Sequence, residues 1–332
     1  MHYNTKLSEM EKIGMKPKNI DVIIPVYNAS NTLKKCITSL LKQHFDSFNI
    51  ILIDDGSNDS SSYICDSYKK YDNVCVYHIK NSGRAYARNY GLKVSKSKYI
   101  MFVDSDDWVA NGFLKEAFDF MKESQNDIGV FNYYIAFNDS RVKIANANYY
   151  QNSKINLKKE DAFRGLLDDT IGNYAWNKIY KREVLKNIEY PVGKDFEDLA
   201  TMYKIFNNAN KIGIMNKVLY YYFQRKDSIM HSLSTKVIGD SLEARIELEN
   251  YIKSNYPTLI KLSHQKLVFN ALQYTVYAYR EQSFNDMFNQ AVQILEQSKI
   301  ASIPGWKNQL MIFLFNYNKN LFRFIANKTR KK

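Results

Sequence analysis

Three carboxylates lie within four residues, at Asp104, Asp106 and Asp107, and they are the side chains in this sequence best suited to chemistry. Carboxylates this close repel one another unless a cation or a basic group compensates them. Oxygen ligands of this kind suit Mg²⁺ or Mn²⁺, which usually take few protein carboxylates and complete their shell with substrate phosphates. An EF-hand is excluded, because the sixth position from Asp104 is Val109 rather than Gly and the twelfth is Lys115 rather than Glu. The segment therefore predicts a divalent ion bound together with a phosphate-containing substrate.

Short apolar runs precede this segment and alternate with helical patterns. The runs predict strands over 20–26, 49–53, 74–79 and 99–103, and a further strand is expected over 128–134. Strands that alternate with helices indicate a mainly parallel, doubly wound sheet flanked by helices. In such sheets, ligands bind beyond the carboxyl ends of the strands.

Each of the first four predicted strands is followed by a polar motif. The motifs are Pro25-Val26-Tyr27-Asn28, Asp54-Asp55-Gly56-Ser57, Asn81-Ser82-Gly83 and Asp104-Ser105-Asp106-Asp107. Any one of them alone is equally well explained as an Asx turn or a helix cap, which favour the same residue types. All four in register favour one ligand site at the edge of the sheet.

A phosphate-binding site in this chain needs a metal or basic side chains. No G-x-G-x-x-G motif follows the first predicted strand, and the sequence has no Walker A loop. Arg84 and Arg88 follow Gly83 one helical turn apart, so both can face the same side. We therefore expect these arginines and a divalent ion to bind phosphate together.

In order and spacing, these motifs resemble glycosyltransferase family 2, whose members have the GT-A fold. The resemblance is dense from about residue 20 to residue 125 and includes Asn58-Asp59 and the run Ala87-Arg88-Asn89-Tyr90-Gly91. It implies a donor site in which Pro25, Tyr27 and Asp55 line the nucleoside pocket. The nucleotide-sugar site expected from the motifs and the resemblance comprises Pro25, Val26, Tyr27, Asn28, Asp55, Asn81, Gly83, Arg84, Arg88, Asp104, Ser105 and Arg225.

The resemblance also assigns roles around the diphosphate. Arg88 would organise the site near the diphosphate, and Asp104 would hold the ribose or the metal shell. Asp106 would ligate Mn²⁺ or Mg²⁺ directly, as part of a DXD motif. Asp104 and Asp106 are thus the expected metal residues.

A looser resemblance continues to about residue 230 and supplies the acceptor half. In relatives an acidic pair before a helix provides the catalytic base, which implies Asp198 as the base, with Glu197 as its neighbour. The alternative is that the pair only caps a helix, since acids are favoured at helix N-termini. Asp195 is a second candidate for the base. Weaker acceptor-side candidates are Trp176, Asp195, Ser228 and His231.

The expected activity is transfer of a sugar from a nucleoside-diphosphate sugar to a hydroxyl of a glycan or lipid-linked glycan. One base without a covalent nucleophile gives a single displacement, which inverts the anomeric carbon. The resemblance further implies a UDP-sugar donor, a hexosyl or N-acetylhexosaminyl group, and a place in cell-surface polysaccharide or capsule synthesis. The alternatives are a sugar nucleotidyltransferase, whose Gly-rich phosphate loop is missing here, and a nucleotide-sugar-binding protein without transferase activity.

The domain organisation follows from the same patterns. We expect an N-terminal extension over 1–19, a GT-A domain over 20–232, and a helical region over 233–332. The GT-A domain would divide into a nucleotide-sugar half over 20–130 and an acceptor half over 131–232. Three cysteines without C-x-x-C spacing fit a reducing compartment. The first 19 residues show no signal-peptide core, so a cytoplasmic protein is expected.

The C-terminal segment is basic and patterned. Residues 307–332 hold seven of the basic residues and no acid, over half of the net charge of +13. One helical stripe is expected to carry Leu310, Phe313, Leu314, Tyr317, Leu321, Phe324 and Ile325. Such a helix could lie on an anionic membrane surface at the inner face of the plasma membrane, pack on its own domain or form a homodimer contact. A nucleic-acid partner is not expected, because no aromatic-basic platform stands out elsewhere.

Overall fold

The computed structural model describes residues 18–137, 141–145, 155–224, 234–299 and 303–328. The chain forms two compact units, each built from separate stretches of sequence. The first unit consists of 1–155, 175–187 and 213–223, and the second of 156–174, 188–212 and 224–332. The domain boundaries expected at 19, 130 and 232 stay predictions.

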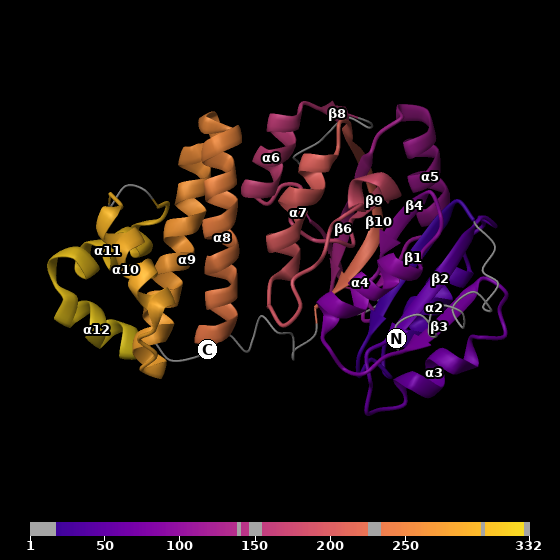
Figure 1. Ribbon diagram of the computed structural model, residues 1–332, viewed down its shortest axis with the longest axis horizontal. Coiled ribbons are helices and arrows are strands. Elements are labelled where there is room, and N and C mark those ends of the chain that lie inside the picture. The colour runs from indigo at the N-terminus through magenta and orange to yellow at the C-terminus, as the bar shows by residue number, and fades with distance from the viewer. Residues whose placement is uncertain (1–17, 138–140, 146–154, 225–233, 300–302, 329–332) are drawn as a thin grey trace, which may run out of the picture. The chain divides into compact units, whose positions relative to one another are not determined.

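Four parallel strands form one side of the sheet in the first unit (Figure 1). They are β1 (Ile20–Val26), β2 (Phe48–Asp54), β3 (Val74–His78) and β4 (Tyr99–Phe102), in the order β3-β2-β1-β4. β1 pairs in parallel with both β2 and β4, and β2 pairs in parallel with β3. The predicted parallel sheet is confirmed here, and the carboxyl ends of these strands share one edge.

The other side of the sheet is mixed. β9 (Lys178–Lys181) runs antiparallel to β4 and to β6 (Ile128–Ala136). Beyond β6 follow β10 (Ile212–Phe223) and the two-residue strand β5 (Trp108–Val109), which pairs antiparallel with β10. The short strands β7 (Val142–Ile144) and β8 (Ile155–Leu157) complete the set. The strand predicted over 128–134 is confirmed, whereas β5 and β9 were not predicted, because β5 has only two residues and β9 begins and ends with lysine.

Helices cover both faces of the parallel strands. α2 (Leu33–Leu41), α3 (Ser61–Ser67) and α5 (Phe113–Ser124) share a core with the side chains of Val22 and Ile24 on one face. α4 (Arg84–Val94) packs on the opposite face, where a Cβ at Gly91 would lie 2.4 Å from Cγ2 of Ile23. Only glycine therefore allows α4 to lie this close to β1.

The second unit is mainly helical. It contains α6 (Lys159–Leu167) and α7 (Glu197–Asn208), and the helical region expected after residue 235 is confirmed. That region comprises α8 (Thr235–Asn255), α9 (Ile260–Glu281), α10 (Asp286–Gln297), α11 (Trp306–Tyr317) and α12 (Lys319–Lys328). Figure 1 shows α8 and α9 side by side. In the described part of the chain, no helix has the length and apolar character needed to cross a membrane.

The C-terminal segment differs from its prediction. The prediction of a single helix is wrong, because Asn318 has a non-helical backbone (φ −148°, ψ 69°) and separates α11 from α12. Leu314 does not belong to an outward stripe, since it is buried in the core of the second unit together with Ile312 and Phe315. Sequence periodicity alone did not show which side of α11 packs inward, because both sides are apolar.

Candidate active site

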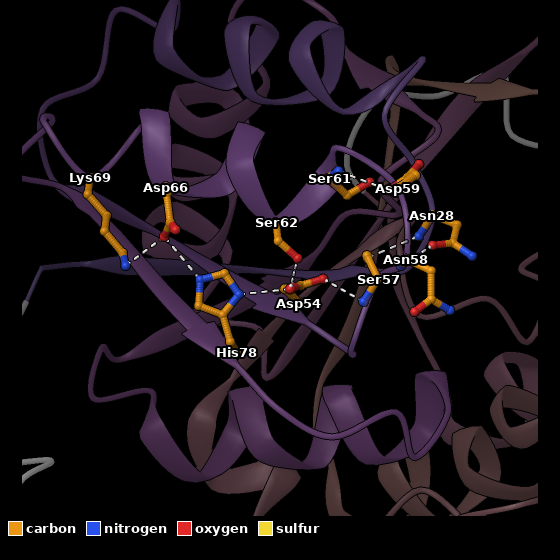
Figure 2. Close-up of polar contacts among 10 residues, drawn as sticks. All are labelled: Asn28, Asp54, Ser57, Asn58, Asp59, Ser61, Ser62, Asp66, Lys69 and His78. Carbon is orange, nitrogen blue, oxygen red and sulfur yellow. Dashed lines mark hydrogen bonds and ion pairs between the residues drawn. The ribbon is translucent and has the colours of Figure 1, made fainter.

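The loop after β1 is bonded to the loop after β2 (Figure 2). The backbone N–H of Asn28 donates to Oγ of Ser57 at 3.1 Å, and that of Asn58 donates to Oδ1 of Asn28 at 2.8 Å. Asn28 has a positive φ of 48°, which asparagine tolerates better than most residues. A third bond runs from the N–H of Ser30 to Asp59. These bonds fix the shape of the loop that presents Tyr27, whose side chain is 47% exposed.

Asp55 holds the loop after β3. Its Oδ1 accepts from the backbone N–H of Ser82 and its Oδ2 from that of Gly83, both at 2.8 Å. Gly83 has a φ of 89° and precedes the first residue of α4, a conformation that disfavours side chains. Burial raises the pKa of Asp55, and the two backbone bonds oppose that rise. Both carboxylate oxygens of Asp55 therefore serve to position the turn that leads into α4.

Asp54, the last residue of β2, begins a series of charged contacts, as Figure 2 shows. Its Oδ2 bonds to Nδ1 of His78 at 2.7 Å, and Nε2 of His78 bonds to Asp66 at 3.0 Å. Lys69 pairs with Asp66 at 2.6 Å. Burial acts to lower the pKa of His78, but the bonds to Asp54 and Asp66 outweigh it and raise that pKa. These charged contacts connect β2, β3 and α3 to one another.

The predicted diphosphate residues lie close together at the end of β4. The guanidinium of Arg88 is fully buried and donates from Nη2 to Oδ1 of Asp104 at 3.0 Å. The side chain of Asp104 is 17% exposed, so one side of the carboxylate stays open. Arg84, the other predicted arginine, is exposed at the start of α4. The two arginines thus differ, since Arg88 compensates Asp104 from inside while Arg84 faces solvent.

Tyr220 on β10 anchors the acidic loop, and sequence reasoning missed it. Its hydroxyl accepts from the backbone N–H of Asp104 at 3.1 Å and donates to Oδ2 of Asp107 at 2.7 Å. The other oxygen of Asp107 accepts from the N–H of Phe223 at 2.7 Å. Burial, followed by the charges of Asp106 and Asp104, raises the pKa of Asp107 well above its usual range. Both oxygens of Asp107 are thus occupied by hydrogen bonds from β10.

Trp176 supports Tyr220 by stacking. The two rings lie 4.6 Å apart at 14°, and the Trp176 ring also stacks on Tyr222 at 5.4 Å and 11°. Trp176 was predicted as an acceptor contact, but its side chain is buried in the core of the first unit. The Trp176 ring therefore affects the site by holding Tyr220 in position.

The remaining predicted donor and acceptor residues differ in where they lie. Pro25 and Val26 are buried in β1, where Val26 belongs to the hydrophobic core and has only backbone to offer a ligand. The side chains of Asn28 and Asn81 are exposed at the strand ends. The carbonyl of Ser105 accepts from the hydroxyl of Thr32 at 3.0 Å. The predicted residues Arg225, Ser228 and His231 lie outside the described residues.

The acidic loop could hold a divalent ion whose remaining ligands come from a substrate. Nowhere in the described ranges do three or more His, Cys, Asp or Glu side chains form a ready-made metal site. Asp107 is buried and bonded to Tyr220 and Phe223, whereas the carboxylates of Asp104 and Asp106 are partly exposed. Mg²⁺ and Mn²⁺ commonly take one or two protein carboxylates and bind substrate phosphates as well, so this donor set fits them.

The predicted base lies in the second unit, at the start of α7. Phe196 has a positive φ of 57° just before the helix, and Glu197 and Asp198 occupy its first turn. Glu197 is 2% exposed, whereas Asp198 is partly exposed. Asp195 is engaged elsewhere, because its carboxylate pairs with Lys236 at 3.0 Å. Glu197 is thus buried, whereas the carboxylates of Asp195 and Asp198 are both partly exposed.

Several known proteins are similar to this chain in sequence or in fold. GlyG, a glycosyltransferase of Streptococcus pneumoniae, is 30% identical over 276 residues, which cover 76% of this chain and 90% of GlyG. The poly(ribitol-phosphate) beta-glucosyltransferase of Bacillus spizizenii is 32% identical over 217 residues, which cover 63% of this chain but only 32% of that enzyme. The crystal structure of S. aureus TarS 1–349 with UDP-GlcNAc has a TM-score of 0.67 at 22% identity. That match covers 94% of this chain and 91% of TarS 1–349, and it shows a common fold.

The sequence pattern described as Glycosyl transferase family 2 matches residues 21–189. The match includes all four strand-end motifs and the segment through Trp176. With the fold and the relatives, it shows that the chain belongs to glycosyltransferase family 2 and has the GT-A fold.

Proposed function

We propose that this glycosyltransferase transfers a hexosyl or N-acetylhexosaminyl group from a UDP-sugar to a hydroxyl of a glycan or lipid-linked glycan. The pairing of buried Arg88 with Asp104, beside partly exposed Asp106, carries the proposal, because it forms a compensated acidic edge suited to a diphosphate with its metal. TarS binding of UDP-GlcNAc and the poly(ribitol-phosphate) acceptor named for the Bacillus enzyme support the donor and acceptor classes. The product would belong to cell-surface polysaccharide, such as capsule or teichoic acid.

Residues of the first unit bind and orient the donor. The exposed ring of Tyr27 and the fixed loop around Asn28 offer a surface for the nucleoside. The turn held by Asp55 places the N-terminus of α4 at the strand ends, where the helix dipole favours an anion. The exposed guanidinium of Arg84 adds a positive charge there.

Asp106 and Asp104 would hold Mn²⁺ or Mg²⁺ together with the donor. When bound, the ion supplies Lewis-acid stabilisation of the charge that develops on the diphosphate. Tyr220 holds the backbone of Asp104 and Arg88 holds its carboxylate, so little reorganisation of Asp104 is needed when the donor binds.

Asp198 is proposed as the base for the acceptor. It would take the proton of the acceptor hydroxyl while the oxygen attacks the anomeric carbon and the bond to the nucleoside diphosphate breaks. One displacement inverts the anomeric carbon, and a base of this kind is worth about 10²–10⁴ in rate. The partial exposure of Asp198 supports it over buried Glu197.

The decisive experiment screens UDP-sugars, with a panel of glycan and lipid-linked acceptors, for UDP release that depends on Mn²⁺ or Mg²⁺. Acceptor-dependent UDP release, with the linkage inverted in the NMR spectrum of the product, is the expected result. Full activity in EDTA would contradict the metal role. Release of pyrophosphate would indicate a nucleotidyltransferase instead, and donor binding without any turnover would indicate a binding protein. A lipid-linked acceptor would place this reaction at the cytoplasmic face of the plasma membrane.

A further inference from the structure

Helix α11 carries apolar side chains all around its axis. Its inner side packs in the core of the second unit through Ile312, Leu314 and Phe315. Its outer side carries residues spaced four, three and four positions apart, namely Trp306, Leu310, Phe313 and Tyr317, which are 69%, 45%, 44% and 73% exposed. A helix that is apolar on every side is normally covered on every side.

Helix α12 has one polar side but also exposes large apolar side chains. Phe322 and Ala326 are buried, whereas Leu321 and Phe324 are 41% and 54% exposed. We refer to the exposed apolar side chains of both helices as the outer stripes, which comprise Trp306, Leu310, Phe313, Tyr317, Leu321 and Phe324. Proteins rarely leave such large apolar groups together in water without an interaction partner.

The charged side chains of α11 and α12 are all basic. The residues from Trp306 to Lys328 include three lysines and an arginine but no acid. The Nζ of Lys307 lies 5.7 Å from the centroid of the Trp306 ring, and that of Lys328 lies 4.3 Å from the centroid of the Phe324 ring. Glu296 of α10 pairs with Lys319 at 2.9 Å and offsets that one charge.

The basic charge of this surface indicates which kind of partner can bind it. A second copy of the chain, placed face to face on the same stripes, would bring like charges together. An anionic lipid bilayer complements both features, because its headgroups attract lysine and arginine while its interface accepts Trp, Tyr and aliphatic side chains. Long lysine side chains can also reach the headgroups while their stems lie along apolar surface.

We propose that the outer stripes of α11 and α12 dock on the surface of an anionic lipid bilayer. Helix α11 has 12 residues, fewer than the roughly 20 that span a bilayer, so it lies along the interface. The docking does not depend on which sugar is transferred. It would hold the enzyme where a lipid-linked acceptor is found.

Co-sedimentation with lipid vesicles tests the proposal. The full-length protein is mixed with vesicles of phosphatidylcholine alone, or of phosphatidylcholine with one-third phosphatidylglycerol, at low and high salt. Binding to the anionic vesicles that weakens at high salt is expected. Failure to bind the anionic vesicles at low salt would overturn the proposal, whatever the transferase assay shows.

Paired variants locate the surface. Phe313→Ser combined with Phe324→Ser should lower vesicle partitioning by roughly tenfold, because each substitution removes apolar area that would be buried in the bilayer interface. The matched control combines Tyr63→Ser with Phe269→Ser, which removes exposed aromatic side chains elsewhere, and it should bind as the wild type does. Lys307→Gln with Lys328→Gln should reduce the preference for anionic lipid. Thermal melting checks that every variant is folded.

Two outcomes would contradict the assignment. Equal vesicle binding by the Phe313→Ser, Phe324→Ser protein and its control would show that the outer stripes are not the docking surface. Light scattering after size exclusion gives the second test, because a wild-type dimer that this variant converts to monomer would show that a second copy covers the stripes.

Discussion

The hydroxyl of Tyr220 donates a 2.7 Å hydrogen bond to Asp107 across 113 residues of sequence. The same oxygen accepts from the N–H of Asp104, so a single buried group contacts both ends of the acidic loop. Asp107 also accepts from Phe223, the last residue of β10. The end of β10 and the loop that carries Asp106 are therefore one hydrogen-bonded structure, and a change at Tyr220 should be felt at the proposed metal ligands.

Tyr220→Phe removes this hydroxyl while keeping the aromatic stack. The N–H of Asp104 and Oδ2 of Asp107 then lose this hydrogen-bond partner, which costs about 1–3 kcal/mol. We expect lower thermal stability and roughly a tenfold higher Mn²⁺ concentration for half-maximal activity, because the loop is no longer held in the shape that binds the ion. Metal titrations of UDP release provide the measurement.

Tyr274→Phe is the matched control for that experiment. The Tyr274 hydroxyl donates to Oδ1 of Asn285 at 2.8 Å within the second unit, so its loss removes a comparable bond away from the acidic loop. This variant should lose stability without a change in metal dependence. Equal metal dependence in both variants would show that Tyr220 only stabilises the fold.

Arg88→Gln tests the compensation of Asp104. The Arg88 side chain has no solvent exposure, and its removal leaves Asp104 without its ion-pair partner. Breaking a buried pair in this way costs about 3–5 kcal/mol in the free energy of unfolding. Urea denaturation of Arg84→Gln supplies the comparison, because Arg84 is exposed and should change stability by no more than about 0.5 kcal/mol. Similar midpoints for the two variants would contradict a structural role for the buried pair.

The pair of His78 and Asp54 gives a pH dependence that can be worked out from its pKa shifts. The pKa of His78 is raised from 6.5, so its contribution to stability is full below 6.5 and is lost as pH rises through the raised value. The pKa of Asp54 is lowered from 3.8, so its contribution is present above 3.8 and is lost as pH falls through the lowered value.

Melting temperatures measured between about pH 5 and pH 9 check this expectation. The wild type should lose stability as pH rises through the neutral range, and His78→Gln should be less stable at low pH and change less over the same range. His44→Gln is the control, and its melting curve should follow that of the wild type. A His78→Gln profile parallel to the wild-type profile would exclude the ion pair as the source.

The strand-end motifs could be predicted from sequence because each lies within a few residues of its strand. Asp104 to Asp107 directly follow β4, and local patterning was enough to place them at one edge with Asp55 and Gly83. The support from Tyr220 could not be predicted, since nothing in a run of aromatic residues tells which one faces the acidic loop.

Burial explains the other differences. Lys178 is fully buried in β9, with Nζ donating to Asn177 at 2.6 Å, so this strand lacks the apolar pattern by which strands are recognised. The predicted acceptor contact Trp176 was chosen as an aromatic residue in a motif, and aromatic residues in cores and in sugar sites look alike in sequence. Distances between the first turn of α7 and the donor residues are not encoded in any local pattern either.

Asp198→Asn tests the proposed base, and its size and shape make it a conservative change. The amide cannot accept the proton of the acceptor hydroxyl, so kcat should fall by about 10²–10⁴. The affinity for UDP-sugar should stay within about twofold, because the base acts on the acceptor and not on the donor. Asp195→Asn is the matched control, since that carboxylate is paired with Lys236, and it should keep most of its turnover. Single-turnover assays with titration calorimetry separate the two effects, and near-normal turnover of Asp198→Asn would remove Asp198 from the mechanism.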